Sequence, residues 1–113
     1  MSNQGNRLEH RWGERVRVNI PVRVLANLPN EASGCMQNLS LSGAFIQSDS
    51  DLRLNTLIEV SIAMPPPSTR TAVIRAHVSR KLKEGVGLEW HEFAPNIIRD
   101  LLRAALRSRI LNP

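Results

Sequence analysis

The most regular pattern in this chain is an alternation of apolar and polar side chains that begins at Val16. Apolar residues occupy every second position as far as Val24, and arginine, asparagine or proline fills each position between them. A period of two places alternate side chains on opposite faces of an extended chain, so it predicts a half-buried strand over 16–24. Pro21 falls on the outward-facing set, and its missing N–H predicts an edge or a bulge at this point.

Shorter apolar runs predict five further strands. These are expected over 36–41, 44–48, 58–64, 72–79 and 86–91. Turn-forming residues separate the strands, because glycine, proline, asparagine and serine interrupt extended chain. The predicted connections are the segment 27–34, the tight link Ser42-Gly43, the polar loop 49–55, the proline triplet 65–67 and the hairpin turn 83–85.

The period changes to that of a helix after Pro95, a residue that suits the first turn of a helix. Apolar residues then recur at spacings of three and four, at Ile97, Ile98, Leu101, Leu102, Ala105 and Leu106. Three arginines, Arg99, Arg103 and Arg107, line the opposite face of the predicted helix. This arginine stripe is typical of a solvated face, and docking to an acidic partner is the alternative.

Together these elements predict a mainly β protein. Six short antiparallel strands and a C-terminal helix favour a six-stranded antiparallel β-barrel over 16–110, with the helix packed outside the barrel or across one mouth. The first ten residues are polar and lack any period. We therefore expect residues 1–15 to form a flexible N-terminal arm.

Composition adds the charge and the expected compartment. The 113 residues suffice for one domain with a modest core, and the net charge is +5, with arginine supplying most of the 15 cationic side chains. This balance favours an acidic partner without identifying it. No apolar run approaches the roughly 20 residues that span a bilayer, and Cys35 has no second cysteine to pair with. We expect a cytoplasmic protein without membrane insertion.

Two arginines, Arg11 and Arg15, lie four residues apart where the expected arm enters the first strand. Guanidinium groups are planar forks that suit phosphates and guanine edges. The same spacing recurs elsewhere in this arginine-rich chain, so position distinguishes this pair, and a solvated basic arm remains the alternative reading. The interpretation depends on a second motif.

That second motif is Asn38-x-Ser40-x-x-Gly43, which occurs once. On its own, an amide, a hydroxyl and a glycine beside a turn often only stabilise the turn. Following the two arginines in the sequence, these groups offer small hydrogen-bonding side chains and a close approach to the backbone. The two motifs together indicate one site for an anionic nucleotide, assembled from two segments.

In this order the two motifs resemble those of the PilZ domain family of bacterial cyclic di-GMP receptors. Segment 9–15 (EHRWGER) is similar to the family's R-x-x-x-R motif, and segment 38–45 (NLSLSGAF) is similar to its [D/N]-x-S-x-x-G motif. Segment 86–90 resembles the glycine-containing late strand, and 94–110 resembles the terminal helix. The resemblance covers nearly the whole chain, and both ligand motifs are complete.

The resemblance implies a barrel that binds cyclic di-GMP on its outer surface, with no catalysis and no other cofactor. Arg11 and Arg15 would contact the phosphates and the O6 and N7 atoms of a guanine. Asn38 and Ser40 would bond the other guanine edge or the ribose-phosphate. Gly43 would permit the turn and leave room for the base.

One position departs from the family pattern. Many members carry a further arginine directly before the first motif arginine, and His10 occupies that position here. In the family this position is thought to influence whether one ligand or an intercalated pair is bound. A histidine is mostly neutral near pH 7, so the stoichiometry stays open. Arg7, on the same arm, is a weaker candidate for the missing charge.

The expected output is an interaction with an unidentified effector protein that changes on ligand binding. One alternative is a ligand-independent PilZ-like adaptor in motility or surface attachment. Another is a small basic barrel that binds nucleic acid, but the chain has no tyrosine and only two Phe and two Trp to stack on bases. We therefore expect no nucleic-acid partner.

We expect no metal and no enzyme activity. The three histidines and Cys35 are scattered without the spacing of a metal site, and no nucleophile motif is present. Trp90 is predicted to be a core residue. Trp12, on the arm, is equally suited to solvent or to a base.

Overall fold

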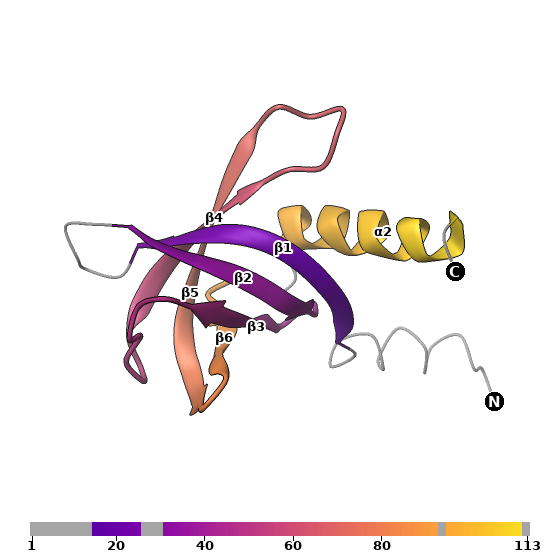
Figure 1. Cartoon of the computed structure of the whole chain (residues 1–113). Coiled ribbons are helices and arrows are strands. Elements are labelled where there is room, and N and C mark those ends of the chain that lie inside the picture. Colours follow the sequence, from indigo (N-terminus) through magenta and orange to yellow (C-terminus); the bar gives the residue numbers. More distant parts are fainter. Residues whose placement is uncertain (1–14, 26–30, 93–94, 112–113) are drawn as a thin grey trace.

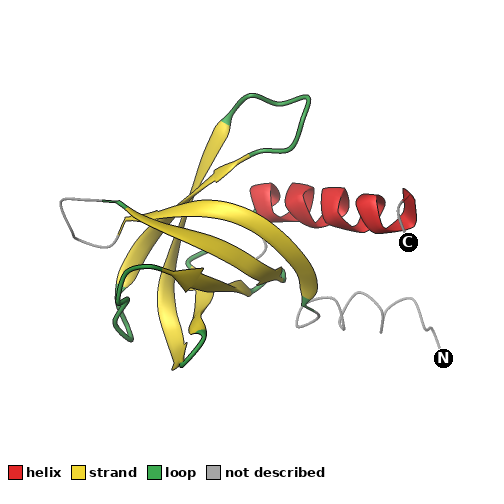
Figure 2. Ribbon diagram, viewed as in Figure 1, coloured by secondary structure: helices red, strands yellow, loops and turns green. Residues whose placement is uncertain are grey.

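The computed structural model describes residues 15–25, 31–92 and 95–111, and for residues 108–111 it describes the backbone alone. The described chain forms strands and one helix, coloured by type in Figure 2. The strands are β1 (Val16–Leu25), β2 (Ala32–Leu39), β3 (Gly43–Ser48), β4 (Leu57–Ala63), β5 (Thr71–Leu82) and β6 (Gly85–Trp90). The helix is α2 (Asn96–Leu111).

The six strands close into an antiparallel barrel in the order β1-β2-β3-β6-β5-β4 (Figure 1). Closure depends on a short seam between β1 and β4, where Val22–Leu25 pairs with 59–62. Closing the sheet pairs part of β1 with part of β4 and so shortens the unpaired edges, which can template aggregation. The predicted six-stranded antiparallel barrel with a C-terminal helix is confirmed.

The inward-facing residues of the strands fill the barrel. The apolar set predicted for the first strand points inward, and Val24 is 1% exposed. Met36, Ile46, Val60, Val78 and Leu88 are also almost fully buried. Trp90 is buried in the same core, as predicted, and its indole Nε1 donates to the carbonyl of Ser40 at 3.2 Å. The buried indole therefore has the partner that its N–H requires.

The helix contributes only its first half to this core. Ile98 and Leu101 are buried among the barrel residues, whereas Arg99, Arg103 and Arg107 are exposed, as the predicted stripe requires. In Figure 1 the C-terminal part of α2 projects past the strands. No helix in the described part of the chain is long and apolar enough to cross a membrane.

The predicted bounds of the second strand were wrong. The strand begins at Ala32, inside the segment expected to be a turn, and ends at Leu39. Gly34 causes the difference: it is paired with Val22 and Ser48 within the sheet. A β-carbon on Gly34 would lie 2.8 Å from the Gln47 carbonyl oxygen, so this glycine permits close packing of strands.

Other bounds also differ, by one residue at each end of the fourth strand (Leu57–Ala63) and the sixth strand (Gly85–Trp90) and by more elsewhere. The link between the second and third strands is 40–42, because Gly43 already belongs to β3. The fifth strand continues to Leu82, three residues beyond the predicted end at Ser79. Its register with β6 shifts between Val78 and Arg80, and this interruption ends the alternation on which the prediction relied.

Candidate functional site

One cross-strand row of outward-facing residues crosses five strands of the barrel. Arg17 on β1 pairs with Asn38 on β2, which pairs with Phe45 on β3. Phe45 pairs with Gly87 on β6, and Gly87 pairs with Arg80 on β5. Residues in register across a sheet share a face, so the row forms a continuous strip on the outside of the barrel. We call these five residues the outer row.

All of the register irregularities between the described strands lie beside this outer row. They fall between Arg17 and Ile20 on β1, between Met36 and Asn38 on β2, and between Val78 and Arg80 on β5. A β-bulge bends a strand and re-aims its side chains, and bulges are over-represented next to functional sites. Their concentration at one row is the main backbone feature of this barrel.

Arg15 enters the site from the residue before β1. Its Nη1 donates to Asn38 Oδ1 at 2.7 Å, which joins side chains 23 residues apart in the sequence. Burial of the guanidinium, together with the nearby charge of Arg80, lowers the pKa of Arg15 from its ordinary value. The group stays protonated near neutral pH because an arginine pKa is normally far above it. The predicted pair of Arg15 and Asn38 is thus brought together.

Arg80 was not predicted as a site residue. Its side chain extends along Gly87: the Cβ and Nε of Arg80 lie 3.4 Å, and its Nη2 3.7 Å, from the point where a Gly87 β-carbon would be. Because Gly87 has no side chain, the arginine can lie across β6 on the outer surface. The sequence signal that could have indicated it is Gly87 itself, since glycine in a strand often marks a close approach.

Between these groups the surface is hollowed. A shallow depression of about 610 Å³ is lined by Arg17, Asn38, Phe45 and Arg80 of the outer row, and by Val18, Asn19, Gln37, Leu82 and Glu84. Phe45 is 8% exposed although it faces outward, and it is absent from the central core cluster. Phe45 therefore supplies the aromatic part of the depression, and Arg17 and Arg80 are the arginines that line it.

Ser40 builds the turn beside this site. The residue is 1% exposed, and its Oγ accepts from the Gly43 N–H at 3.1 Å and from the Ser42 N–H at 3.3 Å. The backbone N–H of Ser40 donates to the Gly43 carbonyl at 2.8 Å, which closes the turn. A hydroxyl that bonds to nearby backbone groups in this way stabilises a turn. Contact between Ser40 and a ligand stays a prediction.

Gly43 allows two strands to approach each other. A β-carbon at this position would overlap the carbonyl oxygen of Leu88 on β6. No described glycine has a positive φ, so the need for glycine here is steric and does not come from a left-handed backbone. The space that Gly43 leaves is filled by the backbone of β6.

The remaining predicted site residues, Arg7, His10 and Arg11, lie outside the described residues, and so does Trp12. Their predicted roles stay predictions. Within the described part of the chain, no group of three or more His, Cys, Asp or Glu side chains gathers in a way that could hold a metal ion.

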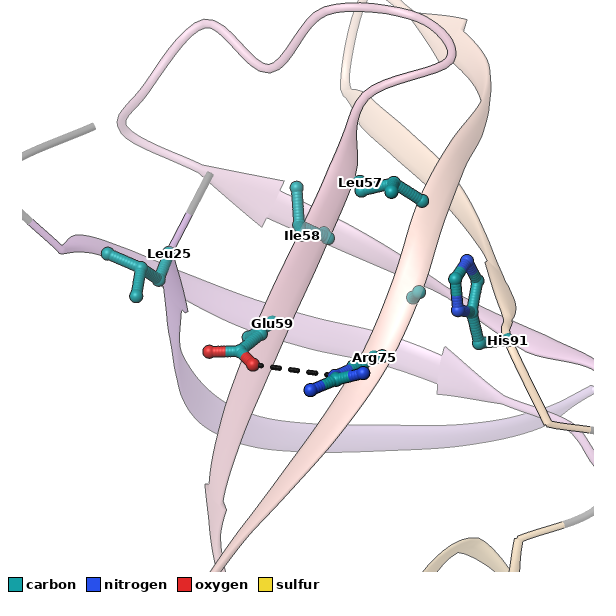
Figure 3. A pocket seen from close by; sticks show the side chains of 7 residues that line it. Leu25, Leu57, Ile58, Glu59, Arg75 and His91 are labelled. Atoms are coloured by element: carbon teal, nitrogen blue, oxygen red, sulfur yellow. Dashed lines mark ion pairs between the residues drawn. The ribbon is translucent and has the colours of Figure 1, made fainter. Parts of the chain in front are cut away.

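A second hollow, of about 360 Å³, lies over β4 and β5 (Figure 3). Figure 3 shows Leu25, Leu57 and His91 around it, and an ion pair between Glu59 and Arg75, whose Oε2 and Nε are 3.7 Å apart. The arginine here has a carboxylate partner. This hollow therefore lacks the like-charged arginines of the outer row.

Comparison with solved structures finds the same fold. The chain is 16% identical to the PilZ domain of CeSA from a cellulose-synthesising bacterium, with a TM-score of 0.63, covering 86% of this chain and 99% of that one. It is 20% identical to the Bacillus subtilis inhibitor of motility MotI/DgrA, with a TM-score of 0.67, covering 87% of this chain and 50% of that one. Comparison with curated proteins gave no match.

The sequence itself matches one protein family over most of its length. The match is to the PilZ domain and extends over residues 6–107, which includes both motifs, all six strands and most of the helix. The barrel topology and the structural neighbours agree with this match. The chain belongs to the PilZ domain family.

Proposed function

We propose that this chain is a receptor for cyclic di-GMP that binds the dinucleotide on the outer surface of the barrel. PilZ domains are in general binding and adaptor domains and receptors of this kind. The observation that carries the proposal is the hydrogen bond between Arg15 and Asn38. It joins the two ligand motifs at the edge of a hollow that is lined with arginines.

The chemistry of these groups suits the ligand. Cyclic di-GMP is a dianion with two guanine bases, and a guanidinium can form a fork with a phosphate or with guanine O6 and N7. Without ligand, Arg15 and Asn38 satisfy each other. The dinucleotide would exchange that bond, in which only the donor is charged, for bonds between the charged guanidinium and a charged phosphate. Arg11 keeps the role predicted from the motifs, whereas Gly43 supports the site through the close packing of β3 against β6.

The proposed output is a change in surface. In this proposal the dinucleotide bridges the N-terminal arm, residues 1–15, and the outer row, so that its binding alters what an effector protein meets. A ligand that joins the arm to the barrel would act through an order–disorder transition of the arm. A truncated variant that lacks residues 1–14 would then bind weakly and lose the response of its effector.

Calorimetric titration with cyclic di-GMP tests the proposal. Wild-type protein should bind, and Arg15→Ala should weaken binding by at least about tenfold, because a charge-assisted contact is worth roughly 1.5–3 kcal/mol. Arg75→Ala is the matched control, since Arg75 is exposed on the same barrel but paired with Glu59. Absence of heat with wild-type protein at tens of micromolar would overturn the proposal.

A ligand-independent adaptor is the second candidate, and exposed apolar residues on another face favour it. Leu57 is 56% and Val73 is 55% exposed on the outside of β4 and β5. One structural neighbour is named an inhibitor of motility, which is consistent with action through a protein partner. If wild type and Arg15→Ala retain the same partners with and without dinucleotide, this candidate replaces the receptor.

A further inference from the structure

Arg80 differs from three other exposed arginines of the described chain in its electrostatic surroundings. Arg23, Arg75 and Arg103 each have a carboxylate within 4 Å, from Glu31, Glu59 and Asp100 respectively. Arg80 has no ion pair with any described residue, and the charge that it acts on is that of Arg15. Two like charges held near each other repel, and an anion placed between them would relieve that repulsion.

The backbone holds Arg80 in this position. On β5, Val78 pairs with Leu88 and Arg80 pairs with Gly87, so Ser79 is an extra residue between two paired ones. The hydroxyl of Ser79 donates to the carbonyl of Gly87 at 3.3 Å. The bulge turns Arg80 onto the outer face, and the missing side chain of Gly87 gives it a place to lie.

The side chain therefore points across β6 toward the hollow that also contains Asn38 and Phe45. The Arg15–Asn38 pair and Arg80 both lie at this hollow, with Phe45 and Gly87 in the row between Asn38 and Arg80. A ligand that carries two negative charges fits an arrangement with cations on both sides. Glu84, on the turn after β5, is the acidic residue that lines the hollow, and it forms no ion pair with Arg80.

We propose that Arg80 is a further ligand-binding residue, contributed by β5, which contacts a phosphate of the bound dinucleotide from the side opposite Arg15. This inference rests on the proposed function. It extends the site beyond the two sequence motifs, to a strand that follows the second motif by some thirty residues. The contact is one of charge, so it depends on the positive side chain and weakens with ionic strength.

Titration of Arg80 variants with cyclic di-GMP at low and high sodium chloride tests the inference. Arg80→Ala should bind about tenfold more weakly than wild type at low salt, and the difference should shrink at high salt. Arg80→Lys should recover most of the affinity, because it keeps the charge. Arg80→Gln keeps much of the aliphatic stem along Gly87 without the charge, and it should behave like Arg80→Ala.

Arg75→Ala serves as the control, because Arg75 lies on the same strand and is neutralised by Glu59. It should bind like wild type at both salt concentrations. If wild type binds and the Arg80→Ala and Arg80→Gln variants bind equally well, the inference is wrong and the proposed receptor function stands. If wild type itself does not bind, the receptor function is wrong and this inference falls with it.

Discussion

At the scale of single residues, glycines in this barrel mark places where two backbones come close. Gly43 faces the carbonyl of Leu88, and Gly34 faces that of Gln47. Neither has a positive φ, so their identity is set by neighbouring strands. The motif glycine is therefore needed for the fold before any ligand is considered.

Gly43→Ala should destabilise the protein by about 3 kcal/mol, the upper end for overpacking, because the obstructing atom belongs to the backbone and cannot rotate away. Urea denaturation measures the change. Gly87→Ala is the control: the three atoms nearest its new methyl group all belong to the Arg80 side chain, none closer than 3.4 Å, and stability should change by less than about 1 kcal/mol. Equal stability of the two variants would contradict this account.

Ser40→Ala should lower the free energy of unfolding by about 1–2 kcal/mol, because two backbone N–H groups lose their acceptor in a buried turn. Thermal or urea unfolding checks it. Ser48→Ala is a matched comparison, since the Ser48 hydroxyl also accepts a backbone N–H, from Ser50, at a less buried position. A smaller effect at Ser40 than at Ser48 would show that the turn does not depend on this hydroxyl.

At the scale of strands and helix, alternation alone predicted where strands occur but not where their alternation breaks. The spacing from Ala72 to Val78 assigns position 80 to the inside of the barrel, and the bulge at Ser79 reverses that assignment. Ser79 looks like any polar strand residue in the sequence. For this reason Arg80 was missed, whereas Arg15 and Asn38, which have a motif spacing, were found.

The loop between β3 and β4 is tied to β5 by an ion pair between Asp51 and Lys81. The hydrogen bond and the charge of Lys81 lower the pKa of Asp51 below its ordinary value. A lowered carboxyl pKa adds stability above the pKa of the unfolded state, and this is lost as the pH falls through the folded pKa. The pair should therefore weaken in acid.

Carbon-13 NMR titration of the Asp51 carboxyl group should show this low pKa directly. Lys81→Met, which keeps the length of the side chain and removes the charge, should raise the pKa of Asp51 toward that of an ordinary aspartate. The carboxyl of Asp100, whose Oδ1 lies 3.9 Å from Arg103 Nη1, is an internal control within the same sample. If the Lys81→Met spectrum leaves the Asp51 pKa unchanged, the ion pair does not form in solution.

At the scale of the whole molecule, the barrel is closed by a seam that uses only part of β1. Only Val22–Leu25 of β1 pairs with β4, while the rest of β1 pairs with β2 alone. Amides bonded in the interior of a sheet exchange more slowly than those on a one-sided strand. The first half of β1 adjoins Arg15, so the proposed ligand site lies next to the less constrained part of the barrel wall.

Hydrogen exchange should resolve the two halves of β1. Amides of residues 22–25 should be more protected from exchange than those of residues 16–20. If cyclic di-GMP binds beside Arg15, it should increase the protection of residues 16–20. β4 and β5 pair over the full length of β4, so peptides from these two strands supply the reference for a fully hydrogen-bonded strand pair. Uniform protection along β1 would mean that the seam does not limit opening.

The surplus residue on β5 has a consequence for how this chain tolerates insertions and deletions. Removing one residue from a strand normally turns every following side chain to the other face. Without Ser79, however, residues 77, 78, 80, 81 and 82 would still pair with 89, 88, 87, 86 and 85 in an uninterrupted ladder. A one-residue gap at Ser79 in a related sequence would therefore keep Arg80 outside the barrel and Val78 inside it.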